Sequence, residues 1–432
     1  MSLRQNAFVL LVLVALLAIV GDWALDADAA RWWRLPAGLL LLGLAYERVI
    51  TGRARFKLEV NSPQRWLLAR PGRLTLHFSQ GLRRRLTLQV APRAPAGFES
   101  DGQVQSIEVI AGQAAQIGLG AVARRLGKFA WPSQAARVAG PLGLAWWPLK
   151  LTHDKVENVV PDRLDYRESA SGAMQGGARI SSRSGTGPQV SQLRSYRPGD
   201  PLRVIDWKAT ARRRQLISRE FAEDQHLDII VAIDAGRSSG VWCGDLDRLG
   251  YYVNATARFA EHAVAQDDRV GVVVFADRPL AALPPGRGLA AVTRIRSVLA
   301  RLEVQAADSN PIHAAAHIRT LVQHRALVIL LTDIEDAASS SQLVTAVRLL
   351  QPKHLPLVVG VVSKNLEDFA SGPARDWLDP YYRLAAEIQR SQRERSVQAL
   401  HALGVPALVT RPEMLERSVF ENYASFRRRR RV

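Results

Sequence analysis

Cysteine is nearly absent from this sequence: the chain of 432 residues has one, Cys243. An internal disulfide is therefore excluded, and a reducing compartment fits the composition. A zinc site built on a Cys-x-x-Cys pair is excluded too, because it needs two cysteines. Hydrophobic residues make up 47% of the chain and charged residues 23%, which excludes a collagen-like or wholly disordered protein. The length indicates about three folding units.

Several motifs for catalysis and for nucleic-acid binding are also lacking. The sequence has no Gly-x-x-x-x-Gly-Lys-[Ser/Thr] phosphate loop, and no histidine–carboxylate pair stands out as a base. Zinc-finger and RNA-recognition motifs are missing as well. We therefore expect a protein that is not an enzyme and does not bind nucleic acid.

Acidic residues are fewer than basic ones, and the formal net charge is +18. Such an excess favours anionic partners. Two basic segments, Arg83–Arg85 and a predicted tail over 426–432 that contains five arginines in a row, are expected to attract anionic lipid. A solvated patch is the alternative for Arg83–Arg85, and a solvated chain end beyond the last helix is the alternative for the tail.

Two apolar runs near the N-terminus, Ala7–Val20 and Leu35–Tyr46, approach the length that crosses a bilayer. We predict a transmembrane helical hairpin within residues 1–54, with helices over about 7–25 and 33–50. A cleaved signal peptide is the alternative, since Ala27-Asp28-Ala29 matches a cleavage site. The second apolar run argues against that alternative.

The residues after the second apolar run decide the predicted orientation. Basic residues concentrate in cytoplasmic loops, so the chain that follows is placed on the cytoplasmic side. We expect a multi-pass protein of the bacterial inner membrane whose soluble part lies in the cytoplasm. The basic residues in question are Arg48, Arg53, Arg55 and Lys57.

Residues 55–160 have short runs in which apolar and polar residues alternate. Leu74, Leu76 and Phe78 form one such run, and residues 86–90 form another. A period of two is typical of half-buried strands. We predict a β-rich, sandwich-like domain here.

Residues 226–425 have the sequence pattern of an α/β domain. Leu227–Ile233 is a near-continuous apolar run of the buried parallel-strand type, and helical periodicity follows over 248–265. Strands that alternate with helices indicate a doubly wound parallel sheet of the Rossmann type. The other strand-like runs are Val270–Phe275, Leu327–Leu331, Leu357–Val362 and Ala407–Val409.

Residues 161–225 join the two domains. They contain a Gly/Ser-rich stretch over 169–187, predicted to be a mobile linker, and then a segment dense in arginine, aspartate and tryptophan. We interpret this segment as an internal salt-bridge network with Trp207 packed in the core; a partner surface is the alternative. Its residues of interest are Arg197, Asp200, Arg203, Asp206, Trp207 and Lys208.

Ligands of open α/β sheets bind at the carboxyl ends of the strands. Asp234 and Ser238 follow the first predicted strand, Asp333 follows the strand over 327–331, and Ser309 precedes a helix between them. Two carboxylates and several hydroxyls are ligands that suit Mg²⁺. Capping of helix N-termini is the simpler interpretation of the same residues.

This arrangement resembles a von Willebrand factor A domain with a metal-ion-dependent adhesion site (MIDAS), whose pattern is Asp-x-Ser-x-Ser, a distant Thr and a distant Asp. Asp234, Ser238 and Asp333 match that pattern, and Ser309 is assigned to the Thr position. Gly236 stands in place of the first serine. The resemblance therefore implies that Mg²⁺ binding is weak or absent.

The segment ahead of the first strand is similar to the signature of domain of unknown function family 58 (DUF58). It reads Arg197-Pro-Gly-Asp200, then Ile205-Asp-Trp-Lys-Ala-Thr210, then Arg219-Glu-Phe221. The sequence Val419-Phe-Glu-Asn-Tyr423 also fits the end of that family.

The family resemblance implies a membrane-anchored, non-enzymatic protein-interaction module with a degenerate adhesion site. Its implied partners are a MoxR-type AAA+ ATPase and other membrane-associated proteins, and its implied role is the assembly or maturation of partner proteins. The alternative is an Mg²⁺-dependent hydrolase or phosphatase at the same sheet edge.

Overall fold

The computed structural model describes residues 2–24, 33–82, 84–110, 113–163, 184–198, 200–222, 226–334, 337–363 and 376–430. The chain divides into two compact units. The N-terminal unit is Met1–Asp162 with Leu299–Glu303, and the C-terminal unit is Arg163–Val298 with Val304–Val432. The Gly/Ser-rich stretch predicted to be a linker lies almost wholly outside the described residues.

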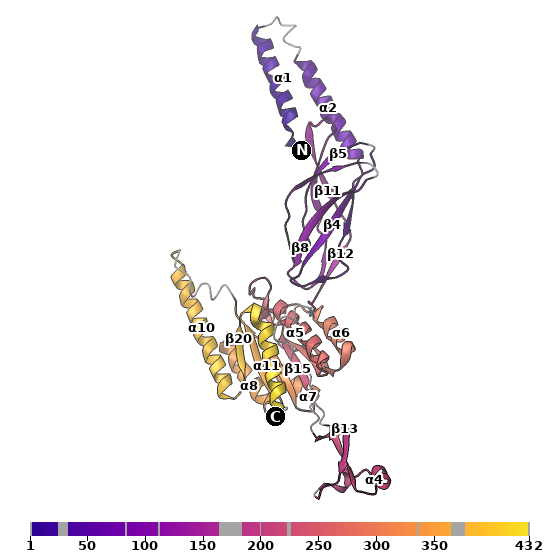
Figure 1. Cartoon of the computed structure of the whole chain (residues 1–432). Helices are drawn as coiled ribbons and strands as arrows, with labels where there is room; N and C mark the ends of the chain where they lie inside the picture. Colours follow the sequence, from indigo (N-terminus) through magenta and orange to yellow (C-terminus); the bar gives the residue numbers. More distant parts are fainter. Residues whose placement is uncertain are drawn as a thin grey trace. The chain divides into compact units, whose positions relative to one another are not determined.

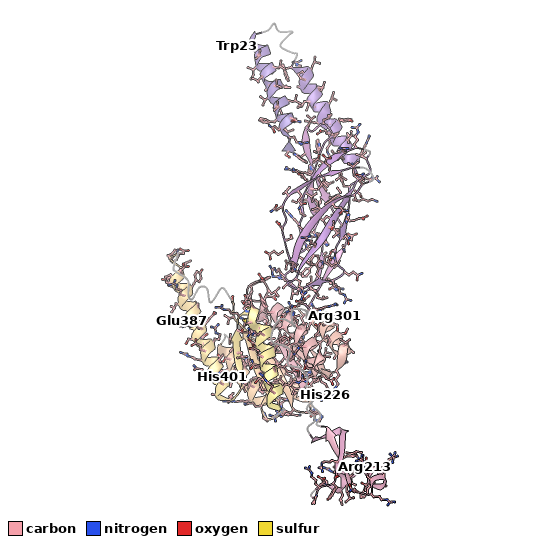
Figure 2. All side chains as sticks on the ribbon, in the orientation of Figure 1. Trp23, Arg213, His226, Arg301, Glu387 and His401 are labelled. Atoms are coloured by element: carbon pink, nitrogen blue, oxygen red, sulfur yellow. The ribbon has the colours of Figure 1, made fainter. Side chains whose placement is uncertain are left out.

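Two helices, α1 (Gln5–Ala24) and α2 (Arg34–Arg53), open the N-terminal unit and run side by side (Figure 1). Most of their apolar side chains are exposed, including Leu39, which is 74% exposed. Trp23 lies at the end of α1 that is remote from the strands (Figure 2). Among the described residues, α2 alone is long and apolar enough to cross a membrane; the apolar part of α1, Gln5–Val20, is shorter.

The rest of the N-terminal unit is β-structure, in sheets of five, four and three strands. Leu74, Leu76 and Phe78 are buried on β4, as the alternation predicts. The strand orders are β1-β11-β10-β5-β7, β2-β4-β8-β6 and β3-β12-β9. The strands are β1 (Ser2–Leu3), β2 (Lys57–Asn61), β3 (Trp66–Leu67), β4 (Pro71–Ser79), β5 (Leu86–Ala91), β6 (Phe98–Ser100), β7 (Gln105–Val109), β8 (Ala115–Ala123), β9 (Gly127–Ala130), β10 (Gln134–Ala139), β11 (Ala145–Leu151) and β12 (Val156–Val160).

The C-terminal unit is built on a six-stranded sheet of order β17-β16-β15-β18-β19-β20. Neighbouring strands are parallel from β16 to β20, whereas the edge strand β17 is antiparallel to β16. The five parallel strands correspond to the five predicted apolar runs. The strands are β15 (Asp228–Asp234), β16 (Arg269–Phe275), β17 (Pro279–Gly286), β18 (Ala326–Leu331), β19 (Leu355–Val361) and β20 (Ala407–Thr410).

Helices pack on both faces of this sheet. Ile230 and Ala232 of β15 belong to a buried cluster that includes side chains from α7 (Pro311–Leu321), α8 (Ala337–Leu350) and α10 (Asp379–Ala402). Successive side chains of a strand point to opposite faces, so the alternate residues of β15 face the other layer. There α5 (Arg248–Ala265) packs on β15 and β16, and α11 (Leu415–Arg430) packs on α5. Helix α6 (Gly288–Leu299) follows β17.

The predicted C-terminal tail is largely helical instead. Helix α11 continues to Arg430, and only residues 431 and 432 lie outside the described part. Arg427 donates to the backbone oxygen of Gln266 at 2.8 Å and to the Tyr423 hydroxyl at 3.1 Å. The start of the arginine run is therefore fixed to the domain, because α11 extends through it.

The segment before β15 forms a β-hairpin with a short helix between its strands. Strand β13 (Ser184–Ser195) pairs with β14 (Ile217–Ala222), and a 3-10 turn η2 (Leu202–Val204) and helix α4 (Trp207–Arg213) connect them. Asp206 is the N-cap of α4 and accepts a hydrogen bond from the backbone N–H of Ala209 at 2.9 Å.

Candidate functional site at the carboxyl edge of the parallel sheet

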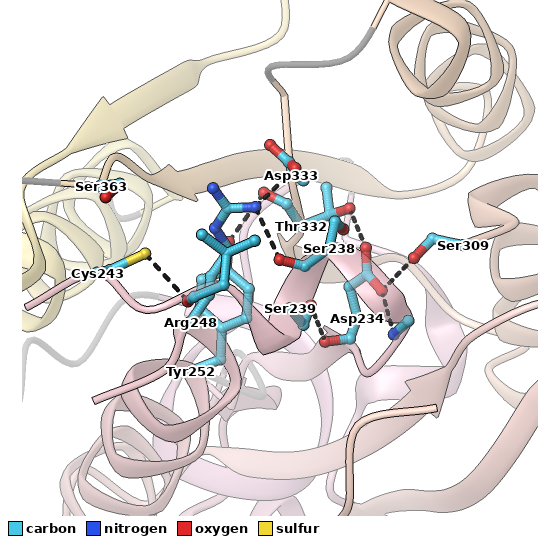
Figure 3. A network of polar contacts seen from close by, with 12 residues as sticks. Asp234, Ser238, Ser239, Cys243, Arg248, Tyr252, Ser309, Thr332, Asp333 and Ser363 are labelled. Carbon is cyan, nitrogen blue, oxygen red and sulfur yellow. Dashed lines mark hydrogen bonds and ion pairs between the residues drawn. The ribbon is translucent and has the colours of Figure 1, made fainter. Parts of the chain in front are cut away.

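The carboxyl ends of β15 and β18 bring the predicted site residues to one edge of the sheet (Figure 3). Asp234 ends β15, and Thr332 and Asp333 follow β18 directly. Ser238 lies in the 3-10 turn η3 (Arg237–Gly240), and Ser309 precedes α7. The topology therefore gathers polar side chains where open α/β sheets bind ligands.

Asp234 is the best-anchored residue of the edge, since its side chain is buried and accepts three hydrogen bonds. The backbone N–H of Gly236 donates to Oδ1 at 2.8 Å, and the Ser309 hydroxyl donates to the same oxygen. The Thr332 hydroxyl donates to Oδ2 at 2.7 Å. The structure brings Ser309 to Asp234 as a hydrogen-bond donor, whereas the prediction placed both as metal ligands, and Thr332 was missed. The sequence could have indicated Thr332, because it lies directly between a predicted strand and Asp333.

Burial raises the pKa of Asp234, and the hydrogen bonds from Ser309, Gly236 and Thr332 oppose that rise. The folded state therefore holds this proton at pH values where the unfolded chain, with an Asp pKa near ~4, releases it. The free energy of unfolding should rise as pH falls from above the folded pKa towards the unfolded one.

We predict that Asp234→Asn removes this pH dependence. The asparagine cannot titrate, so the stability of the parent relative to the variant should increase as pH falls through that window. Urea denaturation of both proteins over a pH series measures the difference. Stability curves that stay parallel across the series would contradict the prediction.

Asp333 lies at the same edge but is engaged by a cation of the protein itself. Nη1 of Arg248, the first residue of α5, is 2.6 Å from Oδ2 of Asp333 and donates to the backbone oxygen of Ser238 at 3.2 Å. The Arg248 side chain is 1% exposed. A buried guanidinium thus neutralises the second carboxylate of the predicted metal site, as Figure 3 shows.

This geometry does not fit a resident Mg²⁺. The ion prefers free carboxylate and water oxygens in octahedral geometry. Here Asp234 is committed to three donors, and Asp333 is paired with the guanidinium, whose fixed positive charge opposes a second cation. Within the described ranges, no group of three or more acidic, histidine or cysteine residues is arranged to hold a metal ion.

Gly236 is required by the packing of this edge. A Cβ atom at that position would collide with the Ser309 hydroxyl and lie 3.1 Å from the backbone oxygen of Ala307. The Ser309 hydroxyl therefore takes the space that the serine of the MIDAS pattern would need.

We predict that Gly236→Ser lowers the free energy of unfolding by about 1–3 kcal/mol, because the new side chain overpacks the edge. Adding Ser309→Gly should restore part of the loss by freeing that space. Thermal denaturation of the single and double variants tests this compensation. Equal stability of parent and single variant would show that the edge accommodates the serine.

Residues 236–240 read Gly-Arg-Ser-Ser-Gly, which has the spacing of a nucleophile elbow. A serine nucleophile needs a base within hydrogen-bond reach. No histidine in the described part of the chain is hydrogen-bonded to Ser238, and the Ser239 hydroxyl donates to the backbone oxygen of Asp234 at 2.8 Å. Among the described residues, the motif therefore has no histidine partner within hydrogen-bond reach.

The arginine-rich signature segment has two structural carboxylates and an exposed tryptophan. Asp200 accepts from Arg194 at 2.8 and 2.9 Å and from the backbone N–H of Arg197 at 3.0 Å, and these contacts hold the Asp200 pKa well below its usual range. Asp206 caps α4 and lies 3.5 Å from Nε of Arg219. Both predicted carboxylates are therefore engaged, but their basic partners are Arg194 and Arg219 rather than the predicted Arg197, Arg203 and Lys208.

Trp207 corrects the prediction for this segment. Its side chain is 63% exposed rather than packed in a core, because it starts α4 on the solvent side. Arg197, Arg203 and Lys208 are exposed as well. The alternative interpretation, a surface available to a partner, fits these side chains better than a core role does.

Comparisons with solved structures give only distant likenesses. The conserved hypothetical protein BatB from Bacteroides thetaiotaomicron is 15% identical, and the match covers 41% of this chain and 98% of that one with a TM-score of 0.26. Native alpha-2-macroglobulin from Escherichia coli is 20% identical over 26% of this chain, with a TM-score of 0.21, and the match spans 17% of that chain. At these scores neither match supports an argument about the fold.

Sequence comparisons find relatives whose own roles are open. The uncharacterized proteins Rv1480 of Mycobacterium tuberculosis and Mb1516 of Mycobacterium bovis are each 24% identical over 247 residues, which is 53% of this chain and 76% of theirs. Residues 192–395, which include the signature segment and most of the parallel sheet, match the family described as "Protein of unknown function DUF58".

Proposed function

We propose that this protein is a membrane-anchored, non-enzymatic interaction module that docks a partner protein at the carboxyl edge of the parallel sheet. In this proposal α1 and α2 form a transmembrane pair in the bacterial inner membrane, and the rest of the chain is cytoplasmic. The exposed apolar side chains of both helices support the anchor, and the basic residues after α2 support the orientation.

The sheet of the C-terminal unit is proposed to be of the von Willebrand factor A type. Five parallel strands with an antiparallel edge strand and helices on both faces support this assignment. Asp234, Ser238 and Asp333 occupy the carboxyl edge in the order that the MIDAS pattern requires. The adhesion site is degenerate in this proposal. Gly236 stands where the pattern has a serine, and the Arg248 guanidinium supplies the positive charge that a metal ion would supply.

One observation carries the docking proposal. An exposed apolar loop lies beside the sheet edge, whose two carboxylates already have partners within the protein. Val241 and Trp242 follow η3 and are 45% and 40% exposed. The backbone holds them there, because the N–H of Val241 donates to Ser238 and the N–H of Arg248 donates to Val241 at 2.9 Å. Tryptophan is enriched among the residues that dominate binding energy at protein interfaces.

The proposed partner is a MoxR-type AAA+ ATPase, by analogy with the family that the sequence resembles. Recognition does not depend on Mg²⁺ in this proposal, because Arg248 already supplies the positive charge at the edge. The same pairing counts against an Mg²⁺-dependent hydrolase or phosphatase, since it leaves Asp333 without a free carboxylate oxygen pair for a metal.

Affinity capture from detergent-solubilised membranes tests this function. The parent chain should retain the ATPase equally with Mg²⁺ and with a chelator, and Trp242→Ala should lose it. Trp377→Ala is the matched control, since Trp377 is 75% exposed elsewhere on the unit. Equal capture by Trp242→Ala, capture that requires Mg²⁺, or phosphate-ester hydrolysis by the pure protein would reject the proposal.

A further inference from the structure

The N-terminal end of α1 and the C-terminal end of α2 contact the β-structure of the N-terminal unit at one place, next to β11 (Figure 1). Strand β1, just before α1, pairs with β11 through Ser2 and Trp146, and the N–H of Arg4 donates to the oxygen of Leu144 at 2.9 Å. Near the end of α2, Glu47 accepts hydrogen bonds from the turn that leads into β11. The junction is therefore a built structure rather than a flexible joint.

Four arginines from four different segments surround this junction, and we name them the arginine collar. Arg4 and Arg137 both lie over the ring of Trp146, at 5.0 and 4.9 Å from its centroid. The other members are Arg48, which lies 5.5 Å from the ring centroid of Trp147, and Arg84, which donates to the Tyr46 hydroxyl at 2.8 Å.

The charges of the collar are not paired with carboxylates in the part of the chain that the structure describes. None of the four arginines forms an ion pair with a carboxylate in the described ranges; Arg137 donates instead to the neutral side chain of Gln89 at 2.7 Å. Glu47 is the carboxylate at the junction, but it is fully buried and its oxygens accept backbone N–H groups. Arg48, Arg84 and Arg137 are exposed, so the collar is accessible to an anion from outside the chain.

Aromatic and apolar side chains beside the collar indicate what carries that anion. Nε1 of Trp147 is buried and has no hydrogen-bond partner among the described residues. Leu142, at the tip of the turn before β11, is 52% exposed. Tryptophan, an exposed apolar side chain and basic side chains together are typical of protein surfaces at the membrane–water interface. The exposed apolar surfaces of α1 and α2 begin at the same place.

We propose that the arginine collar binds the headgroups of anionic phospholipids and so seats the β-domain on the membrane surface. Guanidinium groups match phosphate oxygens with paired hydrogen bonds, and cation–π contacts with Trp146 and Trp147 hold the guanidinium groups in place. This inference rests on the proposed membrane anchor.

The test uses the full chain in nanodiscs of phosphatidylcholine alone and of phosphatidylcholine with phosphatidylglycerol. The anionic lipid should raise the melting temperature of the parent, and native mass spectrometry should find phosphatidylglycerol retained over phosphatidylcholine. In Arg4→Gln/Arg137→Gln the preference should fall about tenfold. The matched control Arg325→Gln/Arg395→Gln removes two exposed arginines of the other unit and should keep the full preference.

A lysine pair and extraction of the membranes by carbonate separate the effect of the collar from misfolding and from failure of the anchor. Arg4→Lys/Arg137→Lys retains the charge and should retain most of the preference even where the glutamine pair folds poorly. Unchanged preference in the glutamine pair, equal loss in the control pair, or equal stabilisation by inorganic phosphate would overturn the collar. Release of the parent chain from membranes by carbonate would instead refute the anchor, so the two failures are distinguishable.

Discussion

Replacing Arg248 by methionine is expected to lower the free energy of unfolding of the C-terminal unit by about 3–5 kcal/mol. The guanidinium is 1% exposed, and its ion pair with Asp333 at 2.6 Å lies at the edge of the core. Removing it takes away the positive charge that lies 2.6 Å from the carboxylate, whose side chain is 12% exposed. An unpaired charge in a buried place costs far more than a lost surface ion pair.

A double-variant cycle separates the pair from the packing. Arg248→Met/Asp333→Leu should recover much of the loss, because replacing both partners by apolar groups removes the unpaired charge. Arg395→Met, at an exposed position, should change stability by less than about 0.5 kcal/mol. Urea denaturation of the parent, of Arg248→Met, of Asp333→Leu and of the double variant measures the coupling energy. An additive cycle would contradict the assignment of the loss to the ion pair.

The same variant tests why the edge does not fit Mg²⁺. With the guanidinium gone, the fixed positive charge that opposes a second cation at the edge is removed, so Mg²⁺ should raise the melting temperature of Arg248→Met but not that of the parent. Calcium and magnesium chloride titrations followed by thermal denaturation provide the measurement, with sodium chloride at matched ionic strength as the control. Equal stabilisation of the parent by Mg²⁺ would show that the ion and the guanidinium coexist.

The parallel strands were predictable because their local signal is strong. Each is a short apolar run between helical stretches, and burial on both faces favours that pattern. The antiparallel strand β17 was not predicted, since Pro279, Pro284 and Pro285 break the expected pattern. Proline is tolerated there because β17 is an edge strand.

The side-chain partners at the sheet edge were much less predictable than its position. Strand order fixes where Asp234 and Asp333 lie, but the sequence does not state which cation reaches them. Arg248 was assigned to the start of a predicted helix, and nothing local distinguishes it from a solvated arginine. Trp207 was misplaced for a related reason: tryptophan is usually well buried, whereas the cap at Asp206 starts α4 with this residue facing solvent.

Glu47 was not singled out, because it lies at the end of an apolar run and its partners are distant in the sequence. Its partners come from residues about 95 positions later in the chain. The N–H groups of Leu142 and Leu144 donate to Oε1 at 2.9 and 3.0 Å, and that of Ala145 donates to Oε2 at 3.0 Å. Gly140 is required beside it, because a Cβ atom there would collide with the carboxylate.

Glu47→Ala is therefore expected to loosen the attachment of α2 to the β-domain, at a cost of about 2–6 kcal/mol. The estimate follows from two or more buried N–H groups left without an acceptor, each costing about 1–3 kcal/mol. Hydrogen–deuterium exchange of the full chain should show lost protection at residues 142, 144 and 145. Glu59→Ala, which removes an exposed carboxylate from β2, should leave these amides protected. Unchanged exchange in Glu47→Ala would mean that the turn before β11 holds its conformation without the glutamate.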